Sequence, residues 1–552
     1  MLGMTRRSRR VRELGPLLAF VCVALAGTGA CGEETHGDPD GTDGGGSSSG
    51  NEGGSSGGEG GIGEDGGPVG PIEPGTPGGP ITSDTECPSL TMPTAAGTLY
   101  VDANASGSED GSKGSPFKTI GKAFAAVGAG GSIWVAAGTY KEKLDIPAKD
   151  VKLLGGFASG FASRTDACAS IVEAPSTTQT AISGDASVRS FAMEGFTIRK
   201  SGHAVAVVGD ESGATVTIAS SVFSENGRPE VEGGAVALER VNAKVIRCLF
   251  RDNHAAKGAA LSCYSGTGDL QLDGSMFARN IGHSDHGGAA YLSPKTGKLT
   301  RNTFTSNVIG KDVGYGWGAG AIVYKSGSNP VNVDLSFNVF TDNLSSVGAL
   351  FVDEGATVKM SHDILYKNRS YPENGVVRGA AIYVDGNGSP GGGSTLIADF
   401  VTVVDNAYTP AGTRSAQVRG GGVYMETFSK ATFTNSIFWN NGNDVFYGES
   451  GCSVTVNNSI APSTCGGPTQ CSIGTNVTMP SAIDFADEAN ADFHEKSTAG
   501  RWSKGSFVND DVTSAAVDKA DPAASVGSEP APNGGRANLG AYGGTSQASK
   551  SP

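Results

Sequence analysis

One recurring position in the sequence holds the side chains best suited to ligand binding. It directly precedes a block of small residues, and six of its copies hold Glu232, Lys257, His286, Trp317, Arg378 and Arg419. Arginine pairs with carboxylates in a planar, two-pronged geometry, and aromatic faces attract cations. With the tyrosines of the preceding loops, these residues predict a groove for an extended, anionic polysaccharide, lined by Tyr315, Trp317, Tyr371, Tyr408, Arg378, Arg419, Lys257 and His286. The plainer interpretation is a solvated turn with ordinary loop residues.

Catalysis by the same residues is a second hypothesis. Arg378 and Arg419 have the chemistry of a lyase base, or of a group that neutralises a uronate carboxylate. No cluster of Asp residues accompanies these two arginines in the sequence. His286, with Asp285 and His283 beside it, is the best acid–base cluster, although such triples in loops are commonly solvated. The sequence therefore favours binding over catalysis and leaves Arg378, Arg419, His286 and Asp285 as the catalytic candidates.

One short motif near the start of the folded region is a candidate metal site. Asp102-x-Asn104-x-Ser106-Gly107 resembles the first half of a calcium-binding loop. Lys113 occupies the twelfth position, where such a loop needs an acidic ligand. Ca²⁺ held by Asp102, Asn104 and Ser106 is one interpretation, and an Asx-rich turn is the other. No spacing of Cys and His residues is typical of a zinc site.

The candidate positions recur because residues 187–441 form a repeat. Each copy has a large apolar residue followed three positions later by Asn, as in Phe223/Asn226, Phe250/Asn253, Phe277/Asn280, Phe304/Asn307, Phe340/Asn343, Leu365/Asn368, Val403/Asn406 and Phe438/Asn441. A period of 25–27 residues, lengthened in later copies to 35–38, predicts a solenoid with three short strands per rung. We expect the Phe column inside and the Asn column bonding at a turn. The residue before Phe is also apolar, so one of these two columns lies at a bend or on a covered outer face.

The lengthened copies carry their extra residues in loops. Residues 308–319, 369–378 and 407–419 form three such loops, all between an Asn and the following small-residue block. Equivalent positions of neighbouring rungs lie about 4.8 Å apart in a stack of parallel strands. The loops therefore line up along one edge of the solenoid, with a spacing close to the length of one sugar unit. This edge is where we expect function.

Both ends of the repeat carry a family resemblance. The first end is similar to the opening of bacterial right-handed parallel β-helix proteins of the pectin-lyase-like superfamily, through Tyr100-Val101-Asp102, Ser115-Pro116-Phe117-Lys118-Thr119-Ile120 and Leu154-Gly155-Gly156-Phe157. The other end resembles a C-terminal module of such proteins, through Asp492-Phe493-His494 and Gly540-Ala541-Tyr542-Gly543-Gly544-Thr545. The resemblance implies an all-β, single-stranded right-handed parallel β-helix with a short N-terminal capping helix, for which Ser115 is the expected N-cap. Family lyases use an Arg or Lys base beside carboxylates, usually with calcium, and family hydrolases use paired Asp near Gly-His-Gly. Neither motif is present here.

The N-terminus resembles an export signal followed by a linker. Residues 1–31 combine an Arg-rich start, an apolar run and a terminal Cys31 whose setting resembles a bacterial lipoprotein cleavage box. Residues 32–86 hold 12 acidic residues, no Lys or Arg and almost no apolar side chains, so we expect a disordered linker. Beyond it we expect an N-terminal cap with the first rungs (87–186), the repeat (187–441), and C-terminal rungs with a capping module (442–552).

The cysteines agree with export, because disulfides persist in oxidising compartments. The plausible pairs are Cys87 with Cys168, and two of Cys452, Cys465 and Cys471. An odd number of cysteines follows Cys31, so at least one thiol stays free, and we expect it within the repeat.

These features together predict an exported monomer that binds extracellular polysaccharide. A lipid on Cys31 would hold it at the outer membrane or cell surface of a bacterium, and without that lipid it would be secreted. The net charge of −15 lies largely in the linker, so the folded part is only mildly acidic, and we expect no nucleic-acid partner because nothing in this charge indicates one. The alternatives are a polysaccharide lyase or glycoside hydrolase acting on glycans that contain uronic acid, and a structural surface spacer without a ligand.

Overall fold

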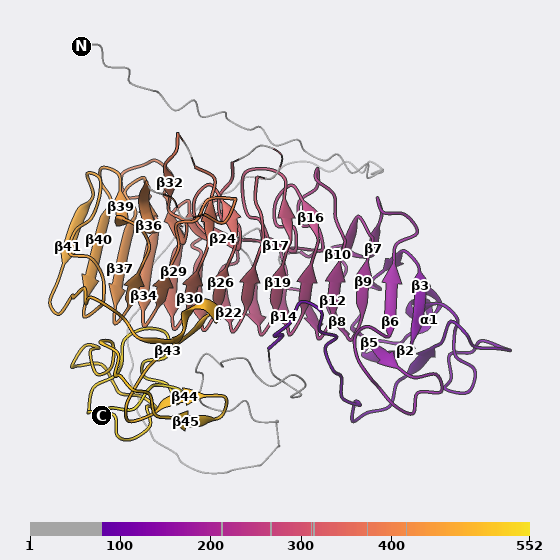
Figure 1. Cartoon of the computed structure of the whole chain (residues 1–552). Coiled ribbons are helices and arrows are strands. Elements are labelled where there is room, and N and C mark those ends of the chain that lie inside the picture. The colour runs from indigo at the N-terminus through magenta and orange to yellow at the C-terminus, as the bar shows by residue number, and fades with distance from the viewer. Residues whose placement is uncertain are drawn as a thin grey trace, which may run out of the picture. The chain divides into compact units, whose positions relative to one another are not determined.

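The chain folds as a right-handed parallel β-helix, which confirms the predicted fold class (Figure 1). The computed structural model describes residues 80–210, 213–264, 268–310, 312, 315–372, 374–413, 415 and 417–552. Rungs stack from the end near α1 (Ile120–Ala126) to β41 (Gln470–Ile473). The predicted signal segment, Cys31 and residues 32–79 of the predicted linker lie outside the described residues.

A regular rung contributes one strand to each of three parallel sheets, called A, B and C in the order in which the rung passes through them. Sheet A contains β1 (Leu99–Val101), β2 (Gly131–Ala136), β5 (Val151–Phe157), β8 (Ser190–Glu194), β11 (Thr215–Ala219), β14 (Asn242–Ile246), β18 (Asp269–Asp273), β22 (Thr296–Thr300), β25 (Asn332–Ser336), β29 (Thr357–Ser361), β34 (Thr395–Asp399), β37 (Lys430–Thr434), β40 (Ser453–Asn457) and β41.

Sheet B contains β3 (Gly138–Lys141), β6 (Ser170–Glu173), β9 (Thr197–Arg199), β12 (Val222–Ser224), β15 (Leu249–Arg251), β19 (Met276–Ala278), β23 (Thr303–Thr305), β26 (Val339–Thr341), β30 (Ile364–Tyr366), β35 (Thr402–Val404) and β38 (Ile437–Trp439). Sheet C contains β4 (Leu144–Asp145), β7 (Thr180–Gly184), β10 (His203–Val208), β13 (Val236–Glu239), β17 (Leu261–Tyr264), β21 (Ala290–Leu292), β24 (Ala321–Tyr324), β28 (Leu350–Asp353), β32 (Val377–Arg378), β33 (Ile382–Val384), β36 (Val418–Met425) and β39 (Asp444–Gly448).

In the described part of the chain, four pairs of short strands lie outside these three sheets. Two parallel pairs lie in the turns between sheets B and C: β16 (His254–Ala255) with β20 (Ile281–Gly282), and β27 (Leu344–Ser345) with β31 (Arg369–Ser370). Two antiparallel pairs lie near the C-terminus: β42 (Phe485–Asp487) with β43 (Asp492–Glu495), and β44 (Arg501–Ser503) with β45 (Ser506–Val508). The 3₁₀ turn η1 (Glu488–Asn490) joins β42 to β43.

The Phe column lies inside the solenoid, as predicted. From Phe223 to Phe340 the rings stack on consecutive rungs with centroids 4.6–4.8 Å apart and interplanar angles of 6–12°. All five rings are fully buried, and each stabilises the fold by roughly 1.5–3 kcal/mol through burial alone. The parallel register of sheet B continues the column through Leu365, Val403 and Phe438.

The Asn column forms a buried hydrogen-bonded ladder at the end of sheet B. Each Asn from 226 to 406 donates through Nδ2 to the Oδ1 of the next ladder residue, at 2.8–3.1 Å. The residue before each ladder Asn has a φ of 51–58°, the left-handed region that favours glycine: Glu225, Asp252, Arg279, Ser306, Asp342, Lys367, Asp405 and Asn440. Such a conformation costs about 1–2 kcal/mol per residue, so the ladder bonds are what hold each corner closed.

The apolar residues before the Phe column point outward, and two segments of the chain cover them. Near the N-terminal end, Ile81 packs on Val222, Leu249 and Met276. The Ile81 N–H donates to the carbonyl of Gly274 at 2.8 Å. The described part of the predicted linker, residues 80–86, therefore already packs on the solenoid, and the predicted linker boundary at residue 86 was wrong. An apolar residue at 81 is the physical reason.

The C-terminal module, residues 483–552, covers the other end of the same face. Phe485, Phe493 and Tyr542 pack there against Ile364 and Ile437 of sheet B. The Gly540 N–H donates to the carbonyl of Asn435 at 2.8 Å, and the Tyr366 hydroxyl donates to the carbonyl of Glu488 at 2.6 Å. In Figure 1 this module is the yellow segment beside β30 and β26. The outward apolar column is thus the second of the two predicted arrangements, a covered outer face.

The helix at the N-terminal end begins later than expected. Thr119, not Ser115, is the N-cap of α1, and its hydroxyl accepts the N–H of Lys122. The Glu142 carboxylate accepts the N–H groups of Ile120 and Gly121 at 2.9 Å, which explains why the helix starts there. The helix still buries Ile120, Ala123 and Phe124 against the first rungs. No helix in the described part of the chain is long and apolar enough to cross a membrane.

Candidate functional site

The lengthened rungs form a recess at the turn from sheet B to sheet C. Tyr315 and Trp317 end one long loop, and Tyr371 and Arg378 belong to the next. Between them lies the short loop of residues 343–348, whose Ser346 and Val347 also line the recess. A short rung between two long ones leaves a gap, because its loop cannot fill the space that the neighbouring loops enclose.

The recess is a pocket of ≈560 Å³, lined by Tyr315, Trp317, Ser346, Val347, Tyr371, Pro372, Arg378, Tyr383 and Glu426. Tyr315, Trp317, Tyr371 and Arg378 were predicted as ligand-binding residues from the sequence. Tyr315 is 49% exposed and meets Trp317 edge-on, with 6.1 Å between the ring centroids. Burial raises the pKa of Tyr371, which stays a neutral hydroxyl. The pocket therefore offers aromatic surface beside one guanidinium group.

The predicted column of residues before the small-residue blocks forms a line in the structure. Its members pair in parallel register on neighbouring rungs: Glu232 with Lys257, His286 with Trp317, Trp317 with Val347, and Arg378 with Arg419. The pairing continues the line to Asp444 beyond Arg419. Stacking therefore places these side chains about 4.8 Å apart along one edge, as the repeat spacing predicts.

Four of the predicted binding residues lie outside the pocket, and besides His286 these are Lys257, Arg419 and Tyr408, which contact other side chains. The Lys257 Nζ lies 5.8 Å from the ring centroid of Tyr291, and the Arg419 guanidinium lies 5.5 Å from that of Tyr447. Each cation thus lies over a tyrosine face, a contact worth about 0.5–1 kcal/mol at an exposed site. The Tyr408 hydroxyl donates at 2.9 Å to the carboxylate of the corner residue that precedes its loop. Tyr408 does not line the pocket.

The predicted histidine cluster divides into two parts. The His286 Nδ1 lies 2.8 Å from the Asp285 Oδ1, and this contact holds the pKa of Asp285 below its ordinary value. His283 instead contacts Asp312 through Nδ1, and the Nδ1 of His254 through Nε2 at 3.0 Å. His286 also lies against Trp317, with ring centroids 4.8 Å apart, so it contacts an aromatic residue of the pocket without lining the pocket itself.

The outer face of sheet C carries two further columns. The first is apolar and aromatic, and its members pair in register: Tyr291, Ile322, Phe351, Tyr383, Tyr424 and Tyr447. The second lies two residues further along each strand and is acidic: Asp353, Asp385, Glu426 and Glu449. The N–H groups of Asp385, Glu426 and Glu449 donate to the carbonyls of Val352, Val384 and Met425 on the preceding rungs, which keeps the column aligned. Burial, then the charges of Asp385 and Glu354, raise the pKa of Asp353 well above its ordinary value. Carboxylates stacked at this spacing resist simultaneous ionisation.

Tyr383 links two of these carboxyl groups at the edge of the pocket. Its hydroxyl lies 3.1 Å from the Asp385 Oδ2 and 3.0 Å from the Glu426 Oε2. One phenolic proton can serve only one of the two acceptors, so the second contact needs a proton on a carboxyl group. Burial, then the charges of Asp385 and Glu449, raise the pKa of Glu426 to about 7. Asp385 also accepts the Gly386 N–H at 2.7 Å, which suits a carboxylate.

The expectation that no acidic cluster accompanies Arg378 was therefore wrong. The signal was present as an aliphatic–aromatic–aliphatic–acidic pattern shortly after the small-residue block, in Leu350-Phe351-Val352-Asp353, Ile382-Tyr383-Val384-Asp385 and Val423-Tyr424-Met425-Glu426. The members of this cluster are not close in sequence, because stacking brings together residues that are a whole rung apart. Aligning each rung from its small-residue block would have found the cluster.

The predicted calcium loop is folded as a hydrogen-bonded turn. The Asp102 Oδ1 accepts the Asn104 N–H at 2.9 Å, and its Oδ2 accepts the Ser159 hydroxyl at 2.7 Å. Both carboxylate oxygens of the 4% exposed Asp102 thus already have protein donors. This is the geometry of an Asx turn, the second of the two predicted interpretations. Calcium at Asp102, Asn104 and Ser106 stays a prediction without further support.

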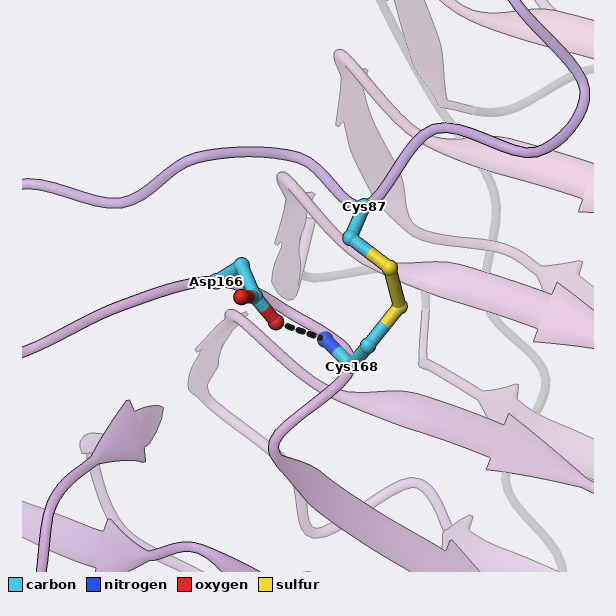
Figure 2. A group of neighbouring side chains, drawn as sticks. All are labelled: Cys87, Asp166 and Cys168. Atoms are coloured by element: carbon cyan, nitrogen blue, oxygen red, sulfur yellow. Dashed lines mark hydrogen bonds between the residues drawn. A yellow bond between two sulfur atoms is a disulfide. The ribbon is translucent and has the colours of Figure 1, made fainter.

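One group of potential metal ligands converges in the described part of the chain, and it is a disulfide. Figure 2 shows Cys87, Asp166 and Cys168, whose ligand atoms all lie within 4.8 Å of one another. Cys87 and Cys168 are joined through their sulfur atoms, and the Asp166 carboxylate accepts the Cys168 N–H at 2.9 Å. Because both sulfur atoms belong to the disulfide, neither is available to a metal ion. The disulfide instead links the start of the folded chain covalently to the first rungs.

Of the remaining cysteines that the structure describes, two form a second disulfide and three are free. Cys465 and Cys471 form a second disulfide, so of the predicted trio Cys452 is the unpaired member. Cys248 and Cys263 within the repeat are free and buried, and burial raises the pKa of each thiol to about 12. These thiols are inert apolar fillers of the core at physiological pH.

Comparison with known proteins finds similarity over separate parts of the chain. Residues 103–349 match a family described as "Protein of unknown function (DUF1565)", and residues 442–520 match one described as "Disaggregatase related". No curated protein sequence matches the chain. Among solved structures, the crystal structure of pectate lyase Pel9A is similar with a TM-score of 0.42 and 13% identity, over 80% of this chain and 95% of that chain. The first family match ends at residue 349, just after the short loop of residues 343–348. Five of the nine residues that line the pocket therefore fall between the two matched segments: Tyr371, Pro372, Arg378, Tyr383 and Glu426.

Proposed function

We propose that the protein binds an extended, acidic polysaccharide along the outer face of sheet C, with the recess as the deepest subsite. The observation that carries this proposal is the pocket itself, in which two long loops place Trp317, Tyr371 and Arg378 around a floor from a short rung. Aromatic side chains supply large apolar contact area at low entropic cost, and sugar rings have apolar faces to match. Arginine matches a carboxylate bidentately.

The charge pattern across this face gives the ligand an orientation. Arg378 and Arg419 pair on neighbouring rungs along one side of the aromatic column, and Asp385 and Glu426 lie along the other. Carboxylates of consecutive uronate units would face the arginines, and the acidic column would accept hydrogen bonds from sugar hydroxyls. One sugar per rung follows from a rung spacing of about 4.8 Å.

A binding panel tests this proposal directly. Calorimetry with neutral and uronic polysaccharides should show preference for the uronic ones, with affinity that falls as salt is added. Trp317→Ala should weaken this binding by about tenfold, because an aromatic contact contributes about 0.5–1.5 kcal/mol beyond the apolar area that it buries. Met479→Ala is the matched control, since Met479 is 50% exposed and does not line the pocket. Unchanged affinity in Trp317→Ala, or no binding by the wild type, would refute the groove and leave a structural spacer.

Cleavage of a glycosidic bond is a second candidate function, favoured by the contact between Tyr383 and Glu426. A carboxyl group with a pKa near 7 can protonate a leaving oxygen, while a neighbouring carboxylate such as Asp385 activates water or stabilises positive charge. New reducing ends would indicate hydrolysis, and ultraviolet absorbance of an unsaturated product would indicate lyase chemistry. Glu426→Gln should then abolish turnover while keeping affinity. Absence of product with every polysaccharide that binds would exclude this function.

We also propose that the protein is exported and held at a bacterial surface through a lipid on Cys31. The support is the sequence of residues 1–31 together with a fold stapled by two disulfides. Metabolic labelling with a radioactive fatty acid, followed by detergent partition, tests this. Cys31→Ser should abolish labelling and release the protein, and Cys22→Ser in the same segment is the control. Equal labelling of the two variants would contradict the anchor.

A further inference from the structure

Sheet A is the only one of the three sheets with a long outer face that stays exposed in the described part of the chain. The outer face of sheet B lies under Ile81 and the C-terminal module, and that of sheet C carries the recess. On sheet A the middle outward residue of six successive strands, from β14 to β34, is exposed: Lys244, Gln271, Lys298, Asp334, Lys359 and Ile397. The parallel register of these strands aligns the six residues in one column, without a bulge.

Lysine recurs on every second rung of this column. Lys244, Lys298 and Lys359 form what we call the lysine row, and Gln271 and Asp334 stand on the rungs between them. Neighbouring strands lie about 4.8 Å apart, so successive members of the lysine row are separated by about 9.6 Å. Within the described chain, no ion pair or hydrogen bond occupies their ammonium groups. The row therefore presents three solvent-facing positive charges at a regular interval.

The columns on either side of the lysine row keep the face flat and mostly neutral. They hold short hydroxyl and amide side chains at Thr296, Thr300, Asn332, Ser336, Thr357 and Ser361. The acidic residues of these columns already have partners. Asp273 contacts the Arg301 guanidinium at 2.6 Å, Asp269 accepts the neighbouring threonine hydroxyl at 2.7 Å, and Asp399 accepts a hydroxyl and an amide proton from the next rung at 2.8 Å. Among the described outward residues of these six strands, Asp334 is thus the one acidic side chain without a partner.

We propose that the outer face of sheet A binds one extended polyuronate chain whose successive sugar units face opposite ways. In such a chain the carboxylates on one side recur at every second unit. One sugar unit is close in length to one rung spacing, so these carboxylates match the lysine row. The intervening units turn hydroxyl groups to Gln271 and Asp334, whose side-chain oxygens accept hydrogen bonds. The flexible lysine stems absorb small differences in spacing.

Asp334 fixes the register of the bound chain. A carboxylate on its rung would face a like charge, whereas the same carboxylate one rung away faces Lys298 or Lys359. An anionic lipid surface is a poorer partner, because it attracts dense basic clusters with apolar anchors, and Ile397, 44% exposed, is the only large apolar member of the column. This face lies on a different sheet from the recess, so the proposal adds a second binding face and does not require that the recess binds a sugar.

The first test maps the lysines that a bound chain protects. The probe is β-1,4-linked polymannuronate, a polyuronate with this alternation, added in saturating amount to the full chain. Reductive methylation, read by mass spectrometry, should slow several-fold at the lysine row, because an ammonium group in an ion pair reacts only when that pair opens. Three control lysines, which are exposed and lie outside sheet A, should react at an unchanged rate: Lys143, Lys200 and Lys504. Neutral β-1,4-mannan should leave the row unprotected. Equal labelling of the row with and without polymannuronate would overturn the proposal, whatever happens at the recess.

The second test asks whether the spacing or the number of charges decides the affinity for polymannuronate. Calorimetry is done in the Trp317→Ala background, so that the recess contributes little. Gln271→Lys combined with Lys298→Gln keeps the net charge but moves one cation by one rung, and should weaken binding by about fivefold, the upper range for one exposed ion pair.

Replacing the whole lysine row with Gln should weaken this binding by at least about tenfold. The same change at the three control lysines should weaken it by less than about twofold, because distant exposed charges are screened. Unchanged affinity in the variant with the moved cation would overturn the proposal. Binding to phosphatidylglycerol vesicles without binding to polymannuronate would also overturn it and would assign the face to a membrane.

Discussion

The interior of sheet B and the outer face of sheet C are built in the same way and differ in one chemical property. Both carry one side chain per rung in register, as the Asn ladder and the column of Asp385 and Glu426 show. An Asn amide both donates and accepts, so identical neighbours satisfy one another. A carboxylate only accepts, so identical neighbours repel. A column of Asn side chains thus satisfies its own hydrogen bonds and stabilises the fold. A column of carboxylates keeps acceptor oxygens that another molecule can bind.

The largest predicted effect comes from breaking the ladder. Asn307→Ala removes four hydrogen bonds: the amide donates to Phe277 and Asn343, and its oxygen accepts from the N–H and Nδ2 of Asn280. The unpaired buried groups should lower the free energy of unfolding by about 4–5 kcal/mol, measured by urea denaturation. Asn332→Ala, at an exposed position on sheet A, is the control and should change it by less than about 0.5 kcal/mol. Equal losses in the two variants would mean that the ladder does not close the rungs.

The second prediction concerns Asp363, which ends a second, shorter ladder at the other end of sheet B, where the Asn302 Nδ2 donates to Asn338 and the Asn338 Nδ2 donates to Asp363. Asp363 lies at the corner before sheet B, where its Oδ1 accepts from the N–H and Nδ2 of Asn338 while its Oδ2 has no partner in the described chain. Burial raises its pKa from 3.8 to about 7. The folded state thus holds a proton that the unfolded chain has released, so stability falls as pH rises from about 4 to 7 and stays low above that range.

Asp363→Asn should therefore raise the free energy of unfolding by about 4 kcal/mol at pH 8, since each pKa unit corresponds to about 1.4 kcal/mol. The gain should shrink towards zero near pH 4. Denaturation series at several pH values measure this directly, with the exposed Asp334→Asn as the control. A gain that does not depend on pH would show that Asp363 is ionised in the folded protein.

A smaller effect is expected from the equivalent change on the outer face. Tyr383→Phe removes the hydroxyl that contacts Asp385 and Glu426 but keeps the ring. Water can replace a donor at the edge of a pocket, so the free energy of unfolding should fall by only about 1 kcal/mol. A loss as large as that of Asn307→Ala would show that the outer columns hold the fold together as firmly as the ladder does.

The smallest effect should be seen in how the affinity for a polysaccharide depends on pH. Glu426 loses its proton as pH rises through about 7, and its negative charge then repels an anionic ligand in the pocket. Affinity for a uronic polysaccharide should fall a few-fold between pH 6 and 8, and Glu426→Gln should abolish this dependence. A neutral polysaccharide provides the control. A dependence that persists in Glu426→Gln would assign the titration to another group.

Periodicity alone was enough to predict the interior. The Phe and Asn columns are read directly from the sequence because each interior position needs one residue type on every rung. What covers the outer face of sheet B was not predictable from the repeat, since Ile81 and the C-terminal module belong to no rung. The helix start was misplaced because Glu142, 23 residues beyond the N-cap, supplies the carboxylate that caps it.

The site was predicted in part, for a related reason. Trp317, Tyr371 and Arg378 stand in the loops that make the rungs irregular, so the sequence marks them. Tyr383 and Glu426 stand in regular strands, where their types are visible but their partners lie a rung away. Which loops enclose a cavity depends on the order of long and short rungs, and this order becomes meaningful only once the stack is built.

The two covers on sheet B have a consequence for how the length of this protein can change. Ile81 packs on the rungs that carry Val222, Leu249 and Met276, and the C-terminal module packs on those from Val339 onward. Thr303 lies between the two sets and belongs to neither cover. A 27-residue unit duplicated or deleted at this point would leave both covers in contact with their rungs, and would keep the Asn ladder that passes through Asn307 continuous. The molecule is thus free to be shortened or lengthened at its centre, by whole rungs, while its two ends stay fixed.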